Sequence, residues 1–233
     1  MRIATFNCRH GAHDGSGPRS QFADTAGLVR AAVSLGADVL ALEEIDRRVV
    51  RSWCRDQPAL LGAATGAATV VFARARRVLV TGHDGVALLV RGTVVSTRTL
   101  RLPGVGAPRV AAIARVRIGE DELTVVATHL QNRMRNGPAE APAQLDALLT
   151  ELGRWPEPWV LAGDLNLRPD VVVPTLAAAG LTPLRAGPTY PAGAPRIEID
   201  WLAVRGLESI GGARTVQLPV GDHRALVADV STS

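Results

Sequence analysis

The sequence predicts an α/β (α+β) fold: a four-layer α/β/β/α sandwich in which two mainly antiparallel sheets pack face to face with helices outside. Strand-like runs outnumber helical ones along the chain, and the helical segments are spread among them. Many neighbouring strand-like runs are joined by short turns that contain Gly or Pro, which is typical of antiparallel pairs. Because each of two such sheets can bury one face on the other and its second face under helices, the sandwich accounts for both observations.

Length and composition indicate one large domain. The chain has 233 residues, of which 47% are hydrophobic and 21% are charged, and we expect a single domain over residues 1–233. The 26 Lys and Arg positions are all Arg, which with abundant Ala, Val and Gly indicates a GC-rich, bacterial-like composition. The net charge is only +4, so it is compatible with a phosphate-bearing substrate without demonstrating a groove for a polyanion.

No segment of the sequence suggests secretion or a membrane span. The chain opens directly on a strand-like run, with no basic leader before an apolar stretch, and no uninterrupted apolar run reaches membrane-spanning length. We therefore expect a soluble, cytoplasmic monomer without membrane insertion. Cys8 and Cys54 can form one disulfide at most, and a reduced pair is the expectation in that compartment.

The expected strands are short apolar or alternating runs bounded by turn residues. They cover residues 3–6, 39–42, 69–72, 86–90, 94–102, 110–118, 123–127, 159–162, 197–204 and 225–230. Helical spacing of apolar residues predicts four helices, over 20–35, 59–65, 142–152 and 174–179. Asp56 and Pro58 suit the start of the second helix, and Gly36 and Gly180 suit the ends of the first and last. Residues 81–85 are expected to form a turn.

Side chains that can bind a ligand or a metal ion, or transfer a proton, lie at the ends of these strands. Some come directly after an apolar run, and others at or just before the start of one. The first group is Asn7, Glu44, His129, Asp164 and Asn166, and the second is Asp200, Asp222 and His223. If the final strands run antiparallel to the earlier ones, all of these side chains emerge at one edge of the sheets.

The segment Gly163-Asp164-Leu165-Asn166 shows how a strand can end in a site. A carboxylate and a carboxamide two residues apart can point toward one ligand if the backbone turns after Gly163, because Gly tolerates the φ and ψ that such a turn needs. The alternative is an Asx-type turn, in which Asp164 or Asn166 bonds its own backbone.

The whole set suits metal-assisted hydrolysis of a phosphate ester. Carboxylates such as Glu44 and Asp222 are ligands for Mg²⁺, for which Mn²⁺ can substitute, and the ion offsets charge on the phosphoryl oxygens. A further carboxylate can activate water, a His can bind phosphate or protonate the leaving oxygen, and Asp200 can orient His223. Taken singly, each residue also has a structural explanation, such as a solvated turn acid or a half-buried histidine. Eight residues at the same kind of position favour chemistry.

Six short segments carry a resemblance to a known family. They are Thr5-Phe6-Asn7, Leu40-Ala41-Leu42-Glu43-Glu44-Ile45, Thr128-His129-Leu130, Gly163-Asp164-Leu165-Asn166, Ile199-Asp200-Trp201 and Gly221-Asp222-His223-Arg224. In this order the chain resembles the endonuclease/exonuclease/phosphatase superfamily, the deoxyribonuclease I-like fold. The match extends from residue 5 to residue 224 and so covers nearly the whole chain.

The resemblance implies a role for each site residue. Asn7, Glu44 and Asp222 would surround the Mg²⁺. Asp164 would position or activate the attacking water, and Asn166 would hold that water and the phosphate. His223, with Asp200 behind it, would serve the phosphoryl oxygens, and His129 would act as a phosphate ligand or acid. The resemblance leaves open which imidazole protonates the leaving group.

Several positions depart from the family pattern, among them Gly221 where Ser is common and Ala225 where Pro is common. Glu43 stands where the family usually has Gln, and the pattern favours its neighbour Glu44 as the metal ligand. Arg9 stands where abasic-site endonucleases tend to carry an acid. The single Tyr of the chain, Tyr190, is not expected to match the active-site tyrosine of those repair enzymes, which argues against a repair nuclease.

The expected activity is Mg²⁺-dependent phosphoester hydrolysis by a phosphodiesterase or nuclease-type enzyme. The alternative is a phosphatase or phosphodiesterase that acts on a small phosphorylated metabolite or a lipid head group, because the motifs define chemistry and leave the substrate open. A third hypothesis is a binding module that has lost catalysis. The presence of Glu44, Asp164, Asn166 and His223 argues against it.

Basic and aromatic residues give weaker signals about the substrate. Arginines cluster at 47–51, 74–77 and 133–135, and clusters of this size usually form a solvated face. Arg133 and Arg135 are the most interesting of them because they closely follow His129, whereas Arg9 and His10 are weaker candidates for a phosphate contact. Aromatic residues are too few to support a stacking platform for single-stranded nucleic acid.

Overall fold

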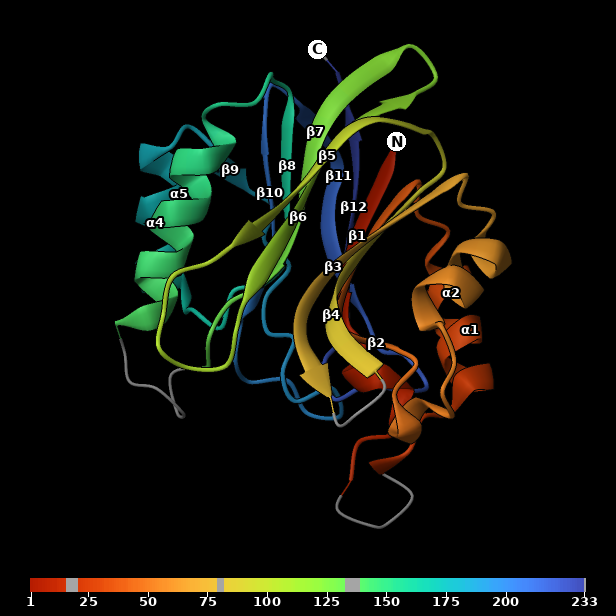
Figure 1. The fold of residues 1–233 in the computed structure, drawn as a ribbon. Helices are drawn as coiled ribbons and strands as arrows, with labels where there is room; N and C mark the ends of the chain where they lie inside the picture. Colours follow the sequence, from red (N-terminus) through yellow and green to blue (C-terminus); the bar gives the residue numbers. More distant parts are fainter. Residues whose placement is uncertain (16–20, 79–81, 133–138, 233) are drawn as a thin grey trace.

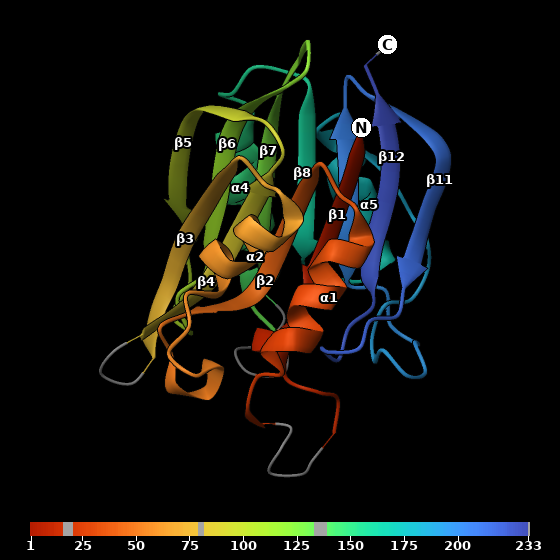
Figure 2. The ribbon, with the colours of Figure 1, turned by 90° about the vertical axis from the view of Figure 1, so that its right-hand side faces the viewer.

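Two six-stranded sheets packed against each other form the centre of the molecule, and helices cover the outer face of each (Figure 1). The computed structural model describes residues 1–15, 21–78, 82–132 and 139–232. A view turned by 90° shows two of the helices in front of the first sheet (Figure 2). The four-layer sandwich predicted from the sequence is confirmed.

The first sheet has the strand order β11-β12-β1-β2-β4-β3. Its strands are β1 (Arg2–Asn7), β2 (Val39–Arg47), β3 (Thr69–Val78), β4 (Gly82–Val90), β11 (Glu208–Val216) and β12 (Ala225–Ser231). The pair β1 and β2 is parallel, and the other neighbours in this sheet are antiparallel.

The second sheet has the strand order β5-β6-β7-β8-β10-β9. Its strands are β5 (Thr93–Arg101), β6 (Val110–Ile118), β7 (Asp121–His129), β8 (Trp159–Asp164), β9 (Thr182–Pro183) and β10 (Asp200–Arg205). Here too one pair is parallel, β7 with β8, and the others are antiparallel. Each sheet thus combines one parallel pair with a mainly antiparallel arrangement.

Of the helices within the described residues, two pack on each sheet. The first sheet carries α1 (Thr25–Leu35) and α2 (Gln57–Thr65), and the second carries α4 (Glu140–Leu152) and α5 (Pro169–Ala178) (Figures 1 and 2). Short 3₁₀ turns, η1 (Arg9–Gly11) and η3 (Val50–Ser52), lie in the connections around β1 and β2. None of the described helices is both long and apolar enough to cross a membrane.

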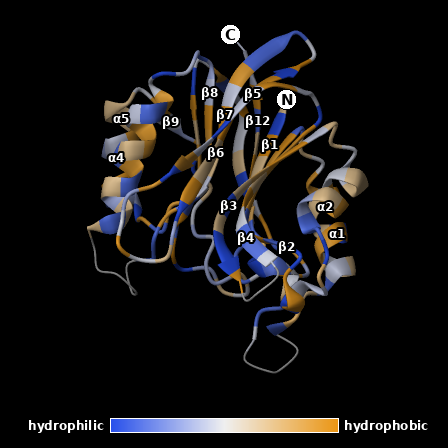
Figure 3. Ribbon diagram, viewed as in Figure 1, coloured by the Kyte–Doolittle hydropathy of each residue, from blue (hydrophilic) through white to orange (hydrophobic). Residues whose placement is uncertain are grey.

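Apolar side chains fill three layers, one between the sheets and one under each pair of helices. The strands are mostly hydrophobic along their middle, but β3 and β4 become hydrophilic at one end (Figure 3). Both chain termini lie at the other end of the sandwich (Figure 1). The polar end is therefore the place where a site can form.

Cys8 is buried, Cys54 is exposed, and both are free thiols.

Two of the expected helices begin five residues from their predicted starts. The helix predicted over 20–35 begins at Thr25, because the Asp24 side chain caps it by accepting a hydrogen bond from the Gly27 N–H at 2.8 Å. The helix predicted over 174–179 begins at Pro169, because a proline at the first helical position needs no N–H partner.

Other expectations about the strands were wrong. Residues 82–85, expected within a turn, begin β4 because they pair with both β2 and β3, and Thr81 lies outside the described residues. Strand β2 does not end at its two acids but continues to Arg47. Strand β11 was missed, because Gly211 and Gly212 interrupt its alternation where its register against β12 shifts.

Candidate active site

Three ionisable side chains lie in one row across the second sheet. His129 ends β7, Asp164 ends β8 and Asp200 begins β10, and the backbone register places His129 beside Asp164 and Asp164 beside Asp200. Val160 and Ala162 on β8 face the apolar layer between the sheets, so Asp164 faces it too, because side chains alternate along a strand. The row is the polar end of the layer between the sheets.

The first sheet supplies Asn7 and Glu44. Asn7 ends β1, and Glu44 lies where the register of β2 against β4 shifts between Leu42 and Ile45. This bulge lets Leu42 and Ile45 both pack on the helix side, and it redirects Glu44 into a cavity. Glu44 adopts a left-handed φ of 54°, a strained conformation for a residue with a side chain and one that is common at functional sites.

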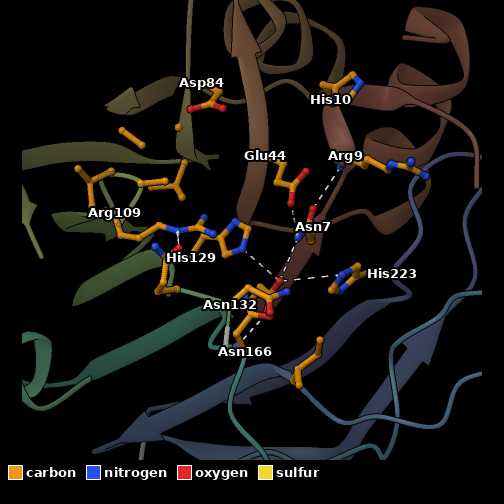
Figure 4. A pocket seen from close by; sticks show the side chains of 18 of the residues that line it. Asn7, Arg9, His10, Glu44, Asp84, Arg109, His129, Asn132, Asn166 and His223 are labelled. Atoms are coloured by element: carbon orange, nitrogen blue, oxygen red, sulfur yellow. Dashed lines mark hydrogen bonds and ion pairs between the residues drawn. The ribbon is translucent and has the colours of Figure 1, made fainter. Parts of the chain in front are cut away.

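Asp164 has the most contacts in the site. Its Oδ2 accepts a hydrogen bond from Nδ2 of Asn7 at 3.0 Å and lies 3.4 Å from Nε2 of His129 and 4.0 Å from Nε2 of His223. Its Oδ1 accepts from the backbone N–H of Asn166 at 2.9 Å, so the Asx-type turn considered from the sequence is present. The side chains of Asn7, His129, Asn166 and His223 approach one spot from four directions (Figure 4).

The two histidines have opposite protonation tendencies. Nδ1 of His223 lies 2.8 Å from Oδ2 of Asp200. Burial opposes the charged form of His223, but the charge and the hydrogen bond of Asp200, together with the charges of Asp164 and Asp222, outweigh burial and raise the pKa of His223 to about 10. Burial, and then the charge of Arg109, hold the pKa of His129 well below its usual value. At neutral pH His223 is thus an imidazolium and His129 a neutral imidazole.

The pKa of Asp164 lies between the pKa values of the two histidines. Burial, and then the charge of Asp200, raise the pKa of Asp164 to about 7. A carboxyl group with a pKa near the ambient pH can both accept and release a proton, which is what a general base needs. Oδ2 of Asp200 also accepts a hydrogen bond from the Thr189 hydroxyl, which fixes the carboxylate behind His223.

Gly163 allows β8 to run close to β7 beside the site. Its φ is 152°, and a Cβ placed on it would lie 2.0 Å from the carbonyl oxygen of Thr128. We expect Gly163→Ala to lower the free energy of unfolding by about 2 to 4 kcal/mol, because the two strands must separate. Urea denaturation measures this change. Gly153→Ala, where a Cβ meets nothing nearer than 3.6 Å, is the control, and equal stability of the two variants would contradict the expectation.

Glu43 lies behind the site rather than in it. Its side chain is fully buried, and within the described residues its carboxyl oxygens contact only the Thr5 hydroxyl, at 3.0 and 3.1 Å. Burial, and then the charge of Asp200, raise the pKa of Glu43 well above its usual value. Glu44, which faces the cavity, is therefore the better placed of the two neighbouring acids to meet a ligand.

Glu43→Gln is expected to stabilise the protein, and to do so more at higher pH. A carboxyl whose folded-state pKa exceeds its unfolded value stabilises the fold fully below the unfolded pKa of about 4.5, and that contribution is lost as the pH rises. The amide has nearly the same shape and no proton to lose. Denaturation of both proteins at pH 5 and pH 9 tests this, and a stability difference that shrinks with rising pH would contradict it.

The row of side chains opens into a cavity of about 680 Å³. The carboxylates of Glu44 and Asp222 line it, and their nearest described partners are distant: Oε1 of Glu44 is 3.5 Å from Nδ2 of Asn7, and Oδ2 of Asp222 is 3.9 Å from Nη1 of Arg9. These oxygens keep unused acceptor capacity. Together with the amide oxygen of Asn7 they form a set of hard oxygen donors, which fits a divalent cation.

A second group of metal-ligating atoms lies deeper. Ligand atoms of Asp164, Asp200 and His223 lie within 4.8 Å of one another, and all three residues are buried. This cluster could bind a metal ion. Two of its members, Nδ1 of His223 and Oδ2 of Asp200, already contact each other at 2.8 Å.

The structure brings the sequence-selected residues together. Of the eight, seven line the cavity, and Asp200 lies behind His223. Tyr190 was given no place in the site, yet it lines the cavity, with its ring centroid 4.8 Å from that of His223. Arg109 was not singled out at all, and nothing in the spacing of the sequence marks either residue. Arg133 and Arg135 lie outside the described residues.

The fold and this site define a class of proteins: two-sheet sandwiches that gather carboxylates, amides and two histidines around a cavity at one end. The model of the Endonuclease/Exonuclease/phosphatase family matches residues 4–223, and the chain belongs to that family. Its members are generally hydrolases of phosphoester bonds and depend on divalent metals. A comparison with curated proteins gave no match.

Solved structures of this fold are similar over the whole chain. An endonuclease/exonuclease/phosphatase from Beutenbergia cavernae is 22% identical with a TM-score of 0.82, over 100% of this chain and 72% of that one. The human Nocturnin catalytic domain is 18% identical with a TM-score of 0.72, over 100% and 93%. Sphingomyelinase C from Streptomyces griseocarneus is 19% identical with a TM-score of 0.69, over 98% of both chains. At these identities the likeness concerns the fold.

Proposed function

We propose that the protein is a Mg²⁺-dependent phosphoester hydrolase of the phosphodiesterase or nuclease type. The observation that carries this proposal is the convergence on Asp164, whose carboxylate lies within 4.0 Å of Asn7, His129 and His223. A carboxyl group with a pKa of about 7, one protonated and one neutral imidazole, and an amide donor are the groups that hydrolysis of a phosphate ester uses.

Asn7, Glu44 and Asp222 are the proposed metal ligands. They offer oxygen atoms toward one cavity, and their carboxylates have no close partner among the described residues. A divalent cation held there offsets negative charge on the phosphoryl oxygens. The deeper cluster of Asp164, Asp200 and His223 is a poorer candidate, because ligation at Nδ1 of His223 would break its contact with Asp200.

The remaining residues act on water and phosphate. Asp164 accepts a proton from the water that attacks phosphorus, and the bond from phosphorus to the leaving oxygen breaks with its electron pair on that oxygen, which takes a proton from an imidazolium or from solvent. Asn166 holds the water with its amide oxygen, which accepts from a water O–H, and the phosphate with the second N–H of Nδ2, whose first N–H donates to the Leu130 carbonyl at 3.1 Å. The charged His223, oriented by Asp200, binds phosphoryl oxygens, and His129 contacts the phosphate as a neutral imidazole.

The size of the cavity supports a substrate larger than a lone phosphate. At about 680 Å³ it is in the range that holds a drug-sized ligand, and five arginines line it: Arg9, Arg51, Arg76, Arg109 and Arg168. Such a space accommodates an ester with substantial groups on both sides of the phosphate, and the arginines suit its negative charge.

Hydrolysis of a panel of phosphate esters in Mg²⁺ tests this function. The panel contains plasmid DNA, a single-stranded oligonucleotide and several phosphorylated metabolites, with His223→Ala as the contamination control. We expect the wild type to cleave nucleic acid and the variant to be slower by about a hundredfold or more. Cleavage that survives in the variant would contradict the proposal, and hydrolysis of metabolites alone would favour the phosphatase alternative.

A further inference from the structure

Arg109 is one of the charged groups that line the cavity and have no step in the proposed chemistry. It directly precedes β6, is partly buried and lines the cavity. Its Nε donates a hydrogen bond to Oε1 of Gln131 at 3.0 Å. Among the residues that the structure describes, no carboxylate lies within 4.0 Å of its guanidinium group, and its two terminal nitrogens make no hydrogen bond.

The arginines on the opposite wall of the cavity differ from Arg109 in this respect. Arg76 forms an ion pair with Asp84 at 2.7 Å, and Arg51 forms one with Asp46 at 2.8 Å. Their positive charges are therefore compensated by the protein itself. Among the described residues Arg109, which lines the same cavity, forms no such ion pair, and Gln131 offers it only a neutral acceptor.

The position of Arg109 is fixed by a chain of buried contacts. The backbone N–H of Gln131 donates to Oε1 of Gln144 on α4 at 2.8 Å, and Nε2 of Gln144 donates to the Pro103 carbonyl at 2.8 Å. The carbonyl of Arg109 accepts from the N–H of Leu102 at 2.9 Å. Gln131 and Gln144 are 2% and 1% exposed. The guanidinium group is thus held in place before any ligand arrives, which reduces the entropy cost of binding.

An arginine in this setting is costly for the folded protein. Burial lowers the pKa of Arg109, and the charges of Asp164, Glu44 and Asp84 oppose this shift only in part, since none of these carboxylates forms an ion pair with it. A charge that is withdrawn from water without a partner destabilises a fold, whereas a bound anion would form two charge-assisted hydrogen bonds with the fork of the guanidinium group. The cavity therefore supplies a site for an anionic group of a ligand.

This site is separate from the place where the phosphate ester is attacked. In the close view of the cavity, the imidazole of His129 lies between Arg109 and the spot where Asn7, Asn166 and His223 meet (Figure 4). The charge of Arg109 affects the pKa of His129, in agreement with their proximity. An anion on Arg109 would thus lie beyond His129, on the side away from His223.

We propose that Arg109 and Gln131 form a subsite for a second phosphate group of the substrate, distinct from the phosphate that is hydrolysed. This inference rests on the proposed function, since it assumes that the phosphate under attack lies at Asp164. The second phosphate belongs either to the neighbouring linkage of a nucleic acid or to a diphosphate in a small molecule. In both cases Arg109 binds two of its oxygens, and Gln131 orients the guanidinium group.

Two trinucleotides of the same sequence test the first source. One carries two charged phosphodiesters, and in the other the linkage that is not cleaved is a neutral methylphosphonate. We expect the wild type to have a kcat/KM about tenfold to a hundredfold higher on the charged trinucleotide, and Arg109→Met to treat the two alike. Because this contact is the same in the ground and transition states, Arg109→Met should raise KM and leave kcat within about twofold.

Calorimetric titration with pyrophosphate and with inorganic phosphate, in EDTA, tests the second source without hydrolysis. We expect the wild type to bind pyrophosphate more tightly than phosphate, Arg109→Met to lose that preference, and Arg109→Lys to keep part of it. Such a result supports the subsite even if no ester is cleaved, so the two proposals can fail separately. Arg117→Met, at the opposite end of β6 in an exposed ion pair with Glu122, is the matched control.

Several outcomes would overturn the subsite. One is a wild type that shows neither a preference for the charged trinucleotide nor tighter binding of pyrophosphate than of phosphate. Another is a preference that Arg109→Met retains. A third is an Arg109→Met protein whose kcat falls at an unchanged KM, because Arg109 would then act at the phosphate under attack, directly or through His129.

Discussion

Asp164→Asn is expected to lower kcat for phosphoester hydrolysis by about a thousandfold while leaving the protein at least as stable as the wild type. The amide has the same shape and can still accept one of the two hydrogen bonds, from Asn7 or from the Asn166 N–H, but it cannot take a proton from water. Stability should not fall, because the variant removes one of several acids that are buried close together, including Asp200 and Glu43.

The measurement pairs steady-state kinetics on a phosphodiester in Mg²⁺ with urea denaturation of the same samples. Asp146→Asn on the exposed side of α4 is the matched control and should keep its activity within about twofold. An Asp164→Asn protein that retains more than a tenth of the wild-type kcat would show that Asp164 does not act on the water. Loss of activity together with loss of stability would assign Asp164 a structural role instead.

Asp200→Asn and His223→Asn are each expected to lower kcat by about a hundredfold to ten-thousandfold, and the double variant should be no slower than the slower single variant. Oδ2 of Asp200 is 2.8 Å from Nδ1 of His223, and Asp200 does not line the cavity, so it contacts no substrate and acts by orienting the imidazole and, through its charge, on the pKa of Asp164. Residues that act as one unit lose their effect together, and their single effects do not add.

Steady-state kinetics of the two single variants and the double variant measure this coupling. Thr189→Val removes the hydroxyl that also bonds to Asp200 and should have a milder effect, since the contact between Asp200 and His223 remains. If the effects of the two single variants on the activation free energy simply add, Asp200 has a role of its own, and its assignment as the residue that orients His223 is wrong.

The alternation of the strands explains why so much of the site could be predicted. Side chains alternate along a strand, so a polar residue two positions after an inward-facing apolar residue also faces the space between the sheets. When such a residue ends its strand, it lies at the end of the apolar layer, as Asn7, His129 and Asp164 do. What the sequence could not give was the strand order. The pairing of β7 with β8 and of β8 with β10 places His129, Asp164 and Asp200 side by side, and it follows from tertiary packing.

The choice between Glu43 and Glu44 required the structure for a different reason. In an unbroken strand Ile45 would face the same side as Glu43, toward the other sheet. The bulge lets Leu42 and Ile45, three positions apart, pack together on the helix side. In the sequence, Leu42 and Ile45 flank the two acids at a spacing that an unbroken strand does not place on one face. This spacing indicates a bulge, and it also indicates that β2 continues past Glu43 and Glu44.

Tyr190 and Arg109 were beyond sequence reasoning because neither belongs to a periodic pattern. Tyr190 lies in the connection between β9 and β10, and its ring reaches His223 because Thr189 next to it is bonded to Asp200. Arg109 lies between β5 and β6, and its neighbours in the cavity come from β7 and the segment that follows it. Contacts between distant loops leave no spacing that a single sequence can display.

Hydrolysis of one phosphodiester as a function of free Mg²⁺ tests the central claim most directly. The wild type should be inactive in EDTA and should recover full activity when Mg²⁺ is restored, whereas Glu44→Gln should need a higher concentration of Mg²⁺ for half-maximal activity because one ligand has lost its charge. Full activity of the wild type in EDTA would contradict a metal-dependent phosphoester hydrolase built on Asn7, Glu44 and Asp222.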